Sequence, residues 1–204
     1  MKKITAFAIS IIISSSLFAN NFSFGVEGGA GINTAAVELS NGTKSDLDFI
    51  PTFRFGGGVE YSFSEVTCLQ LKTFFHHGNG FSFTDSNGKT KVSFMTIDIP
   101  VLLKLTFIGI DNINGRFSIF AGPNFSFRIG DFNESHGGWK NGVNRFSSDD
   151  IFAAGIECGV EYAFTKADGF RLGCSVLFDI SDFSQNADFS TRRFCIMPYL
   201  GYWF

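Results

Sequence analysis

Hydrophobic and polar residues alternate along most of this chain with a period of two, which is the spacing of side chains on the two faces of a β-strand. Phe53, Phe55 and Val59, for example, share one face, and Arg54 and Glu60 share the other. The alternation recurs in eight segments, at residues 22–34, 52–63, 67–76, 92–107, 116–129, 152–164, 170–180 and 193–204. We therefore predict an all-β fold of about eight strands.

The links between these segments alternate in length. Short links at residues 64–65, 108–115 and 165–169 alternate with longer ones at 38–49, 77–91, 131–150 and 181–192. The longer links hold Asn-Gly pairs, which are hairpin-turn signals, at Asn41, Asn79, Asn87 and Asn141. Short turns at one end and long loops at the other are typical of a closed up-and-down antiparallel transmembrane β-barrel. With an even strand number, both termini lie on the short-turn side, which we expect to be the periplasm.

Aromatic residues gather at the short-turn ends of the predicted strands, where a membrane barrel carries an interfacial aromatic girdle. The members of this group are Phe22, Phe24, Tyr61, Phe63, Phe107, Phe117, Tyr162, Phe164, Phe170, Tyr202 and Phe204. The third segment has none. This distribution favours a membrane barrel over a soluble lipocalin-like barrel or sandwich, which would bury its apolar face and expose its polar one.

Composition agrees with strands rather than helices. The chain has 28 Phe and 23 Gly, and a residue with no side chain is a poor helix former. After the N-terminal segment, no stretch without Asp, Glu, Lys or Arg reaches the roughly 18 residues of a membrane-spanning helix. Lys and Arg are scattered, which argues against a nucleic-acid partner.

The first nineteen residues predict a cleaved secretory signal peptide. Lys2 and Lys3 precede an apolar run over residues 4–13, and small residues lead to a cleavage site after Ala19. The apolar run is too short to span a bilayer as a helix. Residues 20–204 then form one outer-membrane barrel domain, whose formal charge is −5 instead of −3 once the two lysines are removed.

The polar face of the strands carries charges of both signs in nearly equal number. Six acidic and seven basic residues are expected inside: Glu27, Glu60, Asp98, Glu157, Glu161 and Asp179, with Arg54, Lys72, Lys104, Arg116, Arg128, Arg171 and Arg193. An eight-stranded barrel is about wide enough for its own side chains, and enclosed charges need partners. We predict a packed ion-pair interior with little conductance, in which inward glycines make room for Arg and Lys.

Other chemistry is weakly indicated. Gly28-Gly29-Ala30-Gly31 opens no helix, so it does not predict a dinucleotide site. His76 and His77 point to opposite faces and His136 lies in the longest link, so no metal site is fixed. No motif holds a nucleophile beside a base, so we expect neither an enzyme nor a cofactor. Outward-facing Cys158 and Cys174 permit a cross-strand disulfide, but two buried thiols are the simpler interpretation.

Three stretches carry a family resemblance. Residues 96–105, Thr-Ile-Asp-Ile-Pro-Val-Leu-Leu-Lys-Leu, resemble a strand of the PorT-like outer-membrane β-barrel domains, and residues 120–125, Phe-Ala-Gly-Pro-Asn-Phe, are similar to their next strand. The ending with Leu200, Tyr202 and Phe204 resembles the signal read by the barrel-assembly machinery. The resemblance implies the fold, insertion into outer-membrane lipid by that machinery, and location in the bacterial outer membrane. It does not fix function.

Two functions fit these patterns. The first is a structural or surface-interaction protein whose long extracellular loops meet a ligand or partner protein. The second is a narrow porin-like channel or small-ligand transport barrel, which requires a hydrated or movable interior.

Overall fold

The computed structural model describes residues 21–39, 49–85, 88–107, 115–136, 139–140, 152–164, 169–181 and 189–204. The predicted signal peptide lies outside these residues, as do most of the links. No helix among the described residues is long and apolar enough to cross a membrane.

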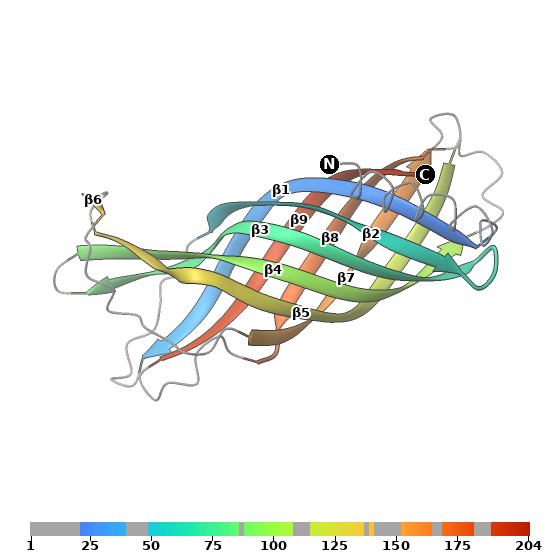
Figure 1. Ribbon diagram of the computed structural model, residues 1–204. Helices are drawn as coiled ribbons and strands as arrows, with labels where there is room; N and C mark the ends of the chain where they lie inside the picture. Colours follow the sequence, from blue (N-terminus) through green and yellow to red (C-terminus); the bar gives the residue numbers. More distant parts are fainter. Residues whose placement is uncertain are drawn as a thin grey trace, which may run out of the picture.

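The described chain forms one closed antiparallel barrel, as predicted from the alternation (Figure 1). Its strands are β1 (Phe22–Leu39), β2 (Ile50–Ser62), β3 (Thr67–Asp85), β4 (Gly88–Phe107), β5 (Gly115–His136), β7 (Phe152–Phe164), β8 (Phe170–Asp179) and β9 (Phe189–Trp203). A two-residue strand, β6 (Trp139–Lys140), pairs with the end of β5. Neighbours follow the order β4-β3-β2-β1-β9-β8-β7-β5, and pairing of β4 with β5 closes the sheet. The predicted fold of eight barrel strands is confirmed.

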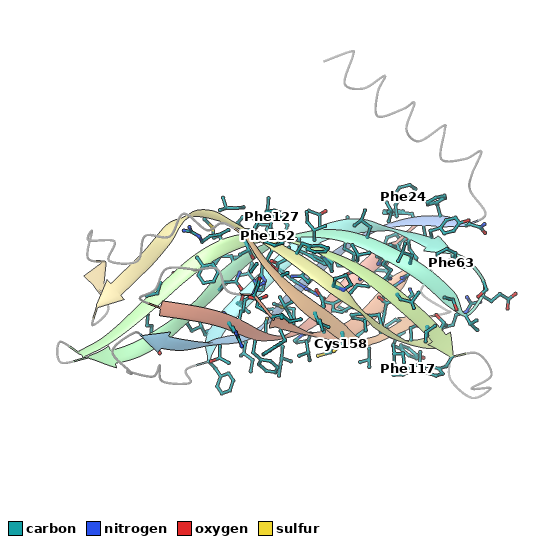
Figure 2. The ribbon with its side chains drawn as sticks, turned by 90° about the horizontal axis from the view of Figure 1, so that it is seen from below. Phe24, Phe63, Phe117, Phe127, Phe152 and Cys158 are labelled. Carbon is teal, nitrogen blue, oxygen red and sulfur yellow. The ribbon has the colours of Figure 1, made fainter. Side chains whose placement is uncertain are left out.

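The two faces of the sheet have opposite polarity. Phe55, Leu103 and Val160 point outward with 56%, 48% and 41% of their surface exposed, whereas the neighbouring Arg54 and Lys104 are 3% and 4% exposed inside. Figure 2 shows Phe24, Phe63, Phe117, Phe127, Phe152 and Cys158 projecting from the outer surface. Apolar side chains outside and charges inside are the reverse of a soluble protein and are the arrangement of a membrane barrel.

Rings cluster at the end where β2 turns into β3. Phe22 packs on Tyr61, Phe107 stacks on Phe117, and Tyr202 lies between Phe170 and Phe204, with ring centroids 4.8 to 5.9 Å apart. Both ends of the described chain meet here, because the Phe204 amide donates to the Phe24 carbonyl oxygen at 2.7 Å. The aromatic girdle predicted for the short-turn end is therefore present.

Five strands extend at least four residues beyond their predicted ends, and this corrects the expected loops. The link 77–91 was expected to be a loop, but β3 continues to Asp85, which lies opposite Gly88 at the start of β4. The Asn79-Gly80 pair makes no turn; it follows Gly78, with φ of 84°, at a register shift inside β3. Likewise, β5 continues to His136, inside the predicted loop 131–150. β1 continues to Leu39, and β9 begins already at Phe189.

Candidate functional site

The barrel interior is the candidate site, because it brings together charged side chains from all eight strands. Inward positions alternate with lipid-facing ones, so each strand contributes every second residue. The buried charges form three clusters along the barrel axis. We call them the long-strand cluster, the central cluster and the short-turn cluster.

The long-strand cluster is built on Arg193 of β9. Its Nε and Nη2 donate to the Asp179 carboxylate at 3.0 and 3.2 Å. Nη2 also donates to Ser126 Oγ at 2.6 Å and lies 3.4 Å from Asp98 Oδ1. Asp98 Oδ2 also contacts His76 Nδ1 at 2.7 Å. Arg193 and Asp98 are almost completely inaccessible, so this guanidinium is held by carboxylates from two other strands.

A hydroxyl, an imidazole and a carboxylate are connected in this cluster, since His76 Nε2 lies 2.7 Å from Thr52 Oγ1. This order is that of a nucleophile, base and orienting acid. The Thr52 hydroxyl, however, donates to the His77 carbonyl oxygen at 2.6 Å and is buried. Its proton is therefore not directed at His76, and the arrangement acts as a hydrogen-bonded brace between β2, β3 and β4.

The central cluster contains two separate ion pairs. Arg54 Nη2 donates to Glu157 Oε1 at 2.7 Å and to Ser175 Oγ at 2.8 Å, and its guanidinium lies 4.3 Å from the centre of the Phe74 ring. Lys72 Nζ donates to both oxygens of Glu27 at 2.8 and 3.1 Å. Each charge in this cluster has one opposite charge beside it, so the cluster is neutral.

The short-turn cluster is a ring of two acids and two bases. Lys104 Nζ donates to Glu60 at 2.5 Å and to Glu161 at 3.1 Å, and Arg171 Nη1 makes the same two contacts at 2.7 and 3.1 Å. The Tyr199 hydroxyl adds a hydrogen bond to Glu161 at 3.1 Å. Each carboxylate is shared by both bases, so removing one charge affects all four.

Aromatic rings fill the space around Lys72. Its Nζ lies 5.5 Å from the centres of the Phe120 and Tyr199 rings and 5.6 Å from that of Trp203, within the range of a cation–π contact. A Cβ on Gly25 would overlap Trp203, and one on Gly173 would overlap Tyr199. These two inward glycines therefore make room for rings, whereas Gly58 makes room for Lys72, as expected.

The three clusters contain eleven of the thirteen predicted interior charges, all in ion pairs. Arg116 and Arg128 lie outside these clusters: Arg116 is exposed at the short-turn end, and Arg128 Nη1 donates to the Gly130 carbonyl oxygen at 3.1 Å. Arg116 was expected inside the network and lies at its mouth instead, because β5 begins only one residue before it.

Sequence reasoning missed two parts of the interior. His76 was taken for the end of a strand, but β3 continues for nine further residues and His76 is fully buried. The inward rings of Phe120, Tyr199 and Trp203 were not singled out, although their position in the alternation places them on the polar face. Within the described residues, no group of three His, Cys, Asp or Glu is arranged to hold a metal ion. The four cysteines are free, and Cys158 lies opposite Val176, offset from Cys174.

Two cavities open at the short-turn end of the interior. The larger, about 470 Å³, is lined by the short-turn cluster, Arg116 and hydroxyl-bearing residues, with Glu65 on the β2–β3 turn. The smaller, about 400 Å³, is lined by Arg116, Arg171, Trp203 and rings of the aromatic girdle. Both volumes lie in the range of small-molecule sites.

Comparison with known proteins agrees with this geometry. The family model described as outer membrane protein beta-barrel domain matches residues 15–185. No curated protein matches the sequence. Among solved structures, the outer membrane protein OprG from Pseudomonas aeruginosa is 15% identical, with a TM-score of 0.52 over 90% of this chain and 96% of OprG.

Two further solved structures are each 12% identical to this chain, with a TM-score of 0.47. Ail, the attachment invasion locus protein of Yersinia pestis, was solved with a heparin analogue and matches over 90% of this chain and 99% of its own. Neisserial surface protein A matches over 88% of this chain and 96% of its own. At these identities the likeness concerns the fold alone.

Proposed function

We propose that this chain, which belongs to the outer membrane protein β-barrel domain family and lies in the bacterial outer membrane, is a non-conducting barrel that acts as a structural or surface-interaction protein. The observation that carries the proposal is the filled interior. Paired charges and aromatic rings from facing strands occupy the space that a pore would need, and no circle of charges of one sign is present among the described interior residues to select ions.

The part of the barrel beyond the membrane supports a surface role. The pairing of β2 with β3 ends at His77, whereas β3 continues to Asp85. The pairing of β7 with β5 ends at Phe127, whereas β5 continues to His136. A bilayer crossing takes about 9–11 residues of tilted strand, whereas β4 has 20 and β5 has 22. The extra length of β3, β4 and β5 forms a three-stranded extension at the end opposite Phe22 and Phe204 (Figure 1).

The orientation of the barrel in the membrane follows from this difference between its two ends, one with short turns and one with extended strands. Short turns and termini of bacterial barrels face the periplasm, and the longer connections face outward. We place the extension of β3, β4 and β5 outside the cell, where it meets an extracellular ligand or partner protein. Outer-membrane lipid then surrounds the apolar outer face.

Export and assembly complete the proposal. Cleavage after Ala19 releases residues 20–204 as the barrel domain, and Leu200, Tyr202 and Phe204 serve as the signal for the barrel-assembly machinery. Leu200 and Tyr202 point outward on β9, next to β1, and Phe204 follows the end of β9, so the signal is accessible before the barrel closes. The motifs at residues 96–105 and 120–125 are the basis for assigning the chain to the PorT-like group, and the interior is assigned no catalytic role.

Conductance tests the proposal directly. Purified full-length protein, shown to be folded by heat-modifiable gel mobility, is incorporated into planar bilayers. We expect no steady single-channel steps. Large, stable openings would overturn the non-conducting barrel and favour the narrow porin-like channel or small-ligand transport barrel.

A second assay tests the surface role. Bacteria carrying a variant shortened within residues 141–150 are compared with bacteria carrying a matched shortening within residues 182–188, and adhesion to a cultured cell layer is measured. The proposal predicts that the first variant loses adhesion while its barrel still folds. Equal adhesion of both variants and the unaltered protein would count against a surface role for this connection.

A further inference from the structure

Both cavities at the short-turn end share one stretch of wall. Arg116, Ala163 and Arg171 are the three residues that line the cavity of about 470 Å³ and also the cavity of about 400 Å³. The smaller cavity contains no acidic side chain among its described lining residues, although it contains both arginines. Arg171 belongs to the neutral ion-pair ring of the short-turn cluster, so Arg116 gives this recess its unbalanced positive charge.

The register of three adjacent strands creates this recess. Arg116 of β5 lies opposite Ala163 of β7, and Ala163 lies opposite Arg171 of β8, so the three side chains form one row on the inner face. Neighbouring strands are about 4.8 Å apart, which sets the two arginine backbones about 10 Å from each other. Because alanine carries only a methyl group, space is left between two guanidinium groups.

The two arginines differ in what already holds them. Arg171 contacts Glu60 and Glu161, and its guanidinium lies 4.4 Å from the centre of the Trp203 ring, so its position is fixed. Arg116 is exposed and makes no ion pair with any other described residue. The recess therefore combines a fixed guanidinium with an available one, a combination suited to an anion with several acceptor oxygens.

The rest of the lining indicates which anion fits. Phe164, Phe170 and Phe204 of the aromatic girdle line the smaller cavity from the lipid side, and Ser23 adds a hydroxyl. An aromatic rim beside two arginines suits a phosphate group at the level of the lipid headgroups. We infer that this recess binds a phosphate-type anion, either the phosphodiester of a phospholipid headgroup or free phosphate. Its placement in the periplasmic leaflet rests on the orientation proposed above.

Full-length protein in detergent is the material for the test. Native mass spectrometry measures retention of phosphatidylglycerol against diacylglycerol, which has the same acyl chains without the phosphate, and phosphorus NMR line broadening measures binding of inorganic phosphate. The informative variants are R116Q, which removes the available charge, and A163L, which fills the recess and keeps both arginines. R192Q is the matched control, an exposed arginine at the opposite end of the barrel.

We expect R116Q and A163L to weaken binding about tenfold or more, the effect of losing a charge-assisted hydrogen-bonding site, and R192Q to bind as the unaltered protein does. Preference for phosphatidylglycerol with no line broadening by inorganic phosphate identifies the headgroup as the ligand, and line broadening without lipid preference identifies free phosphate. Equal binding by R116Q, A163L and R192Q in both measurements would overturn the inference. Channel openings in planar bilayers would contradict the proposed function without altering this comparison.

Discussion

The Arg54–Glu157 pair offers a quantitative test of how dry the barrel interior is. The two side chains are 3% and 1% exposed and are 2.7 Å apart. Removing one partner of a buried ion pair costs about 3–5 kcal/mol, because the other charge is left without compensation. We expect E157Q to lower the free energy of unfolding by this amount, since glutamine keeps the shape of the side chain and removes its charge.

The size of the effect makes it easy to measure. With a urea m-value of about 2 kcal/mol per molar, a loss of 3–5 kcal/mol moves the unfolding midpoint down by about 1.5–2.5 M. The assay is urea unfolding of the barrel reconstituted in lipid vesicles, followed by the loss of heat-modifiable gel mobility. E65Q is the control, because Glu65 is exposed on the β2–β3 turn and its change is expected within about 0.5 kcal/mol.

A double variant separates pairing from packing. R54M/E157M replaces both charges by apolar side chains, and we expect it to unfold at or above the wild-type midpoint, since a buried ion pair is often no more stable than a packed apolar pair. Arg54 Nε and Glu157 Oε2 also have no hydrogen-bond partner among the described residues. Burying these two atoms therefore costs desolvation free energy that no hydrogen bond offsets. If E157Q unfolds at the same urea concentration as E65Q, the interior is hydrated and the packed-interior account is wrong.

Three further predictions follow from the faces of the strands. L103R places a charge in the lipid-facing band and is expected to lower the free energy of unfolding in vesicles by about 2–4 kcal/mol. L103A keeps this face apolar, so its effect is expected to be smaller. W203A removes a ring from around Lys72 and is expected to lower the free energy of unfolding by about 3–5 kcal/mol. F164A, which changes an exposed, outward-facing residue, is not expected to have this effect. F204S is expected to reduce the folded fraction in cells, measured by gel mobility, while leaving signal-peptide cleavage unchanged; equal folded fractions would contradict the assembly signal.

The faces of the barrel were predictable from the sequence, and the partners inside it were not. Alternation assigns each residue to a face directly, so Arg54, Lys104 and Glu161 were placed inside from their neighbours alone. Which charges meet depends on the tilt and stagger of strands around a closed sheet. Arg54 and Glu157 are 103 residues apart and lie on strands that are not neighbours, so no sequence spacing indicates their contact.

Strand length was the other part that the pattern did not supply. Within the membrane, alternation is required because one face meets lipid. Beyond it, backbone pairing alone can continue a strand, as it does where Ser135 of β5 pairs with Lys91 of β4. The polar composition of residues 77–91 and 131–136 therefore predicted loops where the chain forms paired strands. The same error assigned His76 to a strand end and hid its contact with Asp98.

The outer face gives the most direct test of the account as a whole, and the chain carries a natural reporter on it. Cys158 is exposed on the outer surface of β7 (Figure 2), and Cys174 is the other outward thiol. In a C174A chain reconstituted in vesicles, a nitroxide attached to Cys158 reports collisions with oxygen dissolved in lipid and with an aqueous nickel chelate. The account predicts frequent collisions with oxygen and few with nickel, whereas the reverse would place this face in water and contradict the membrane barrel.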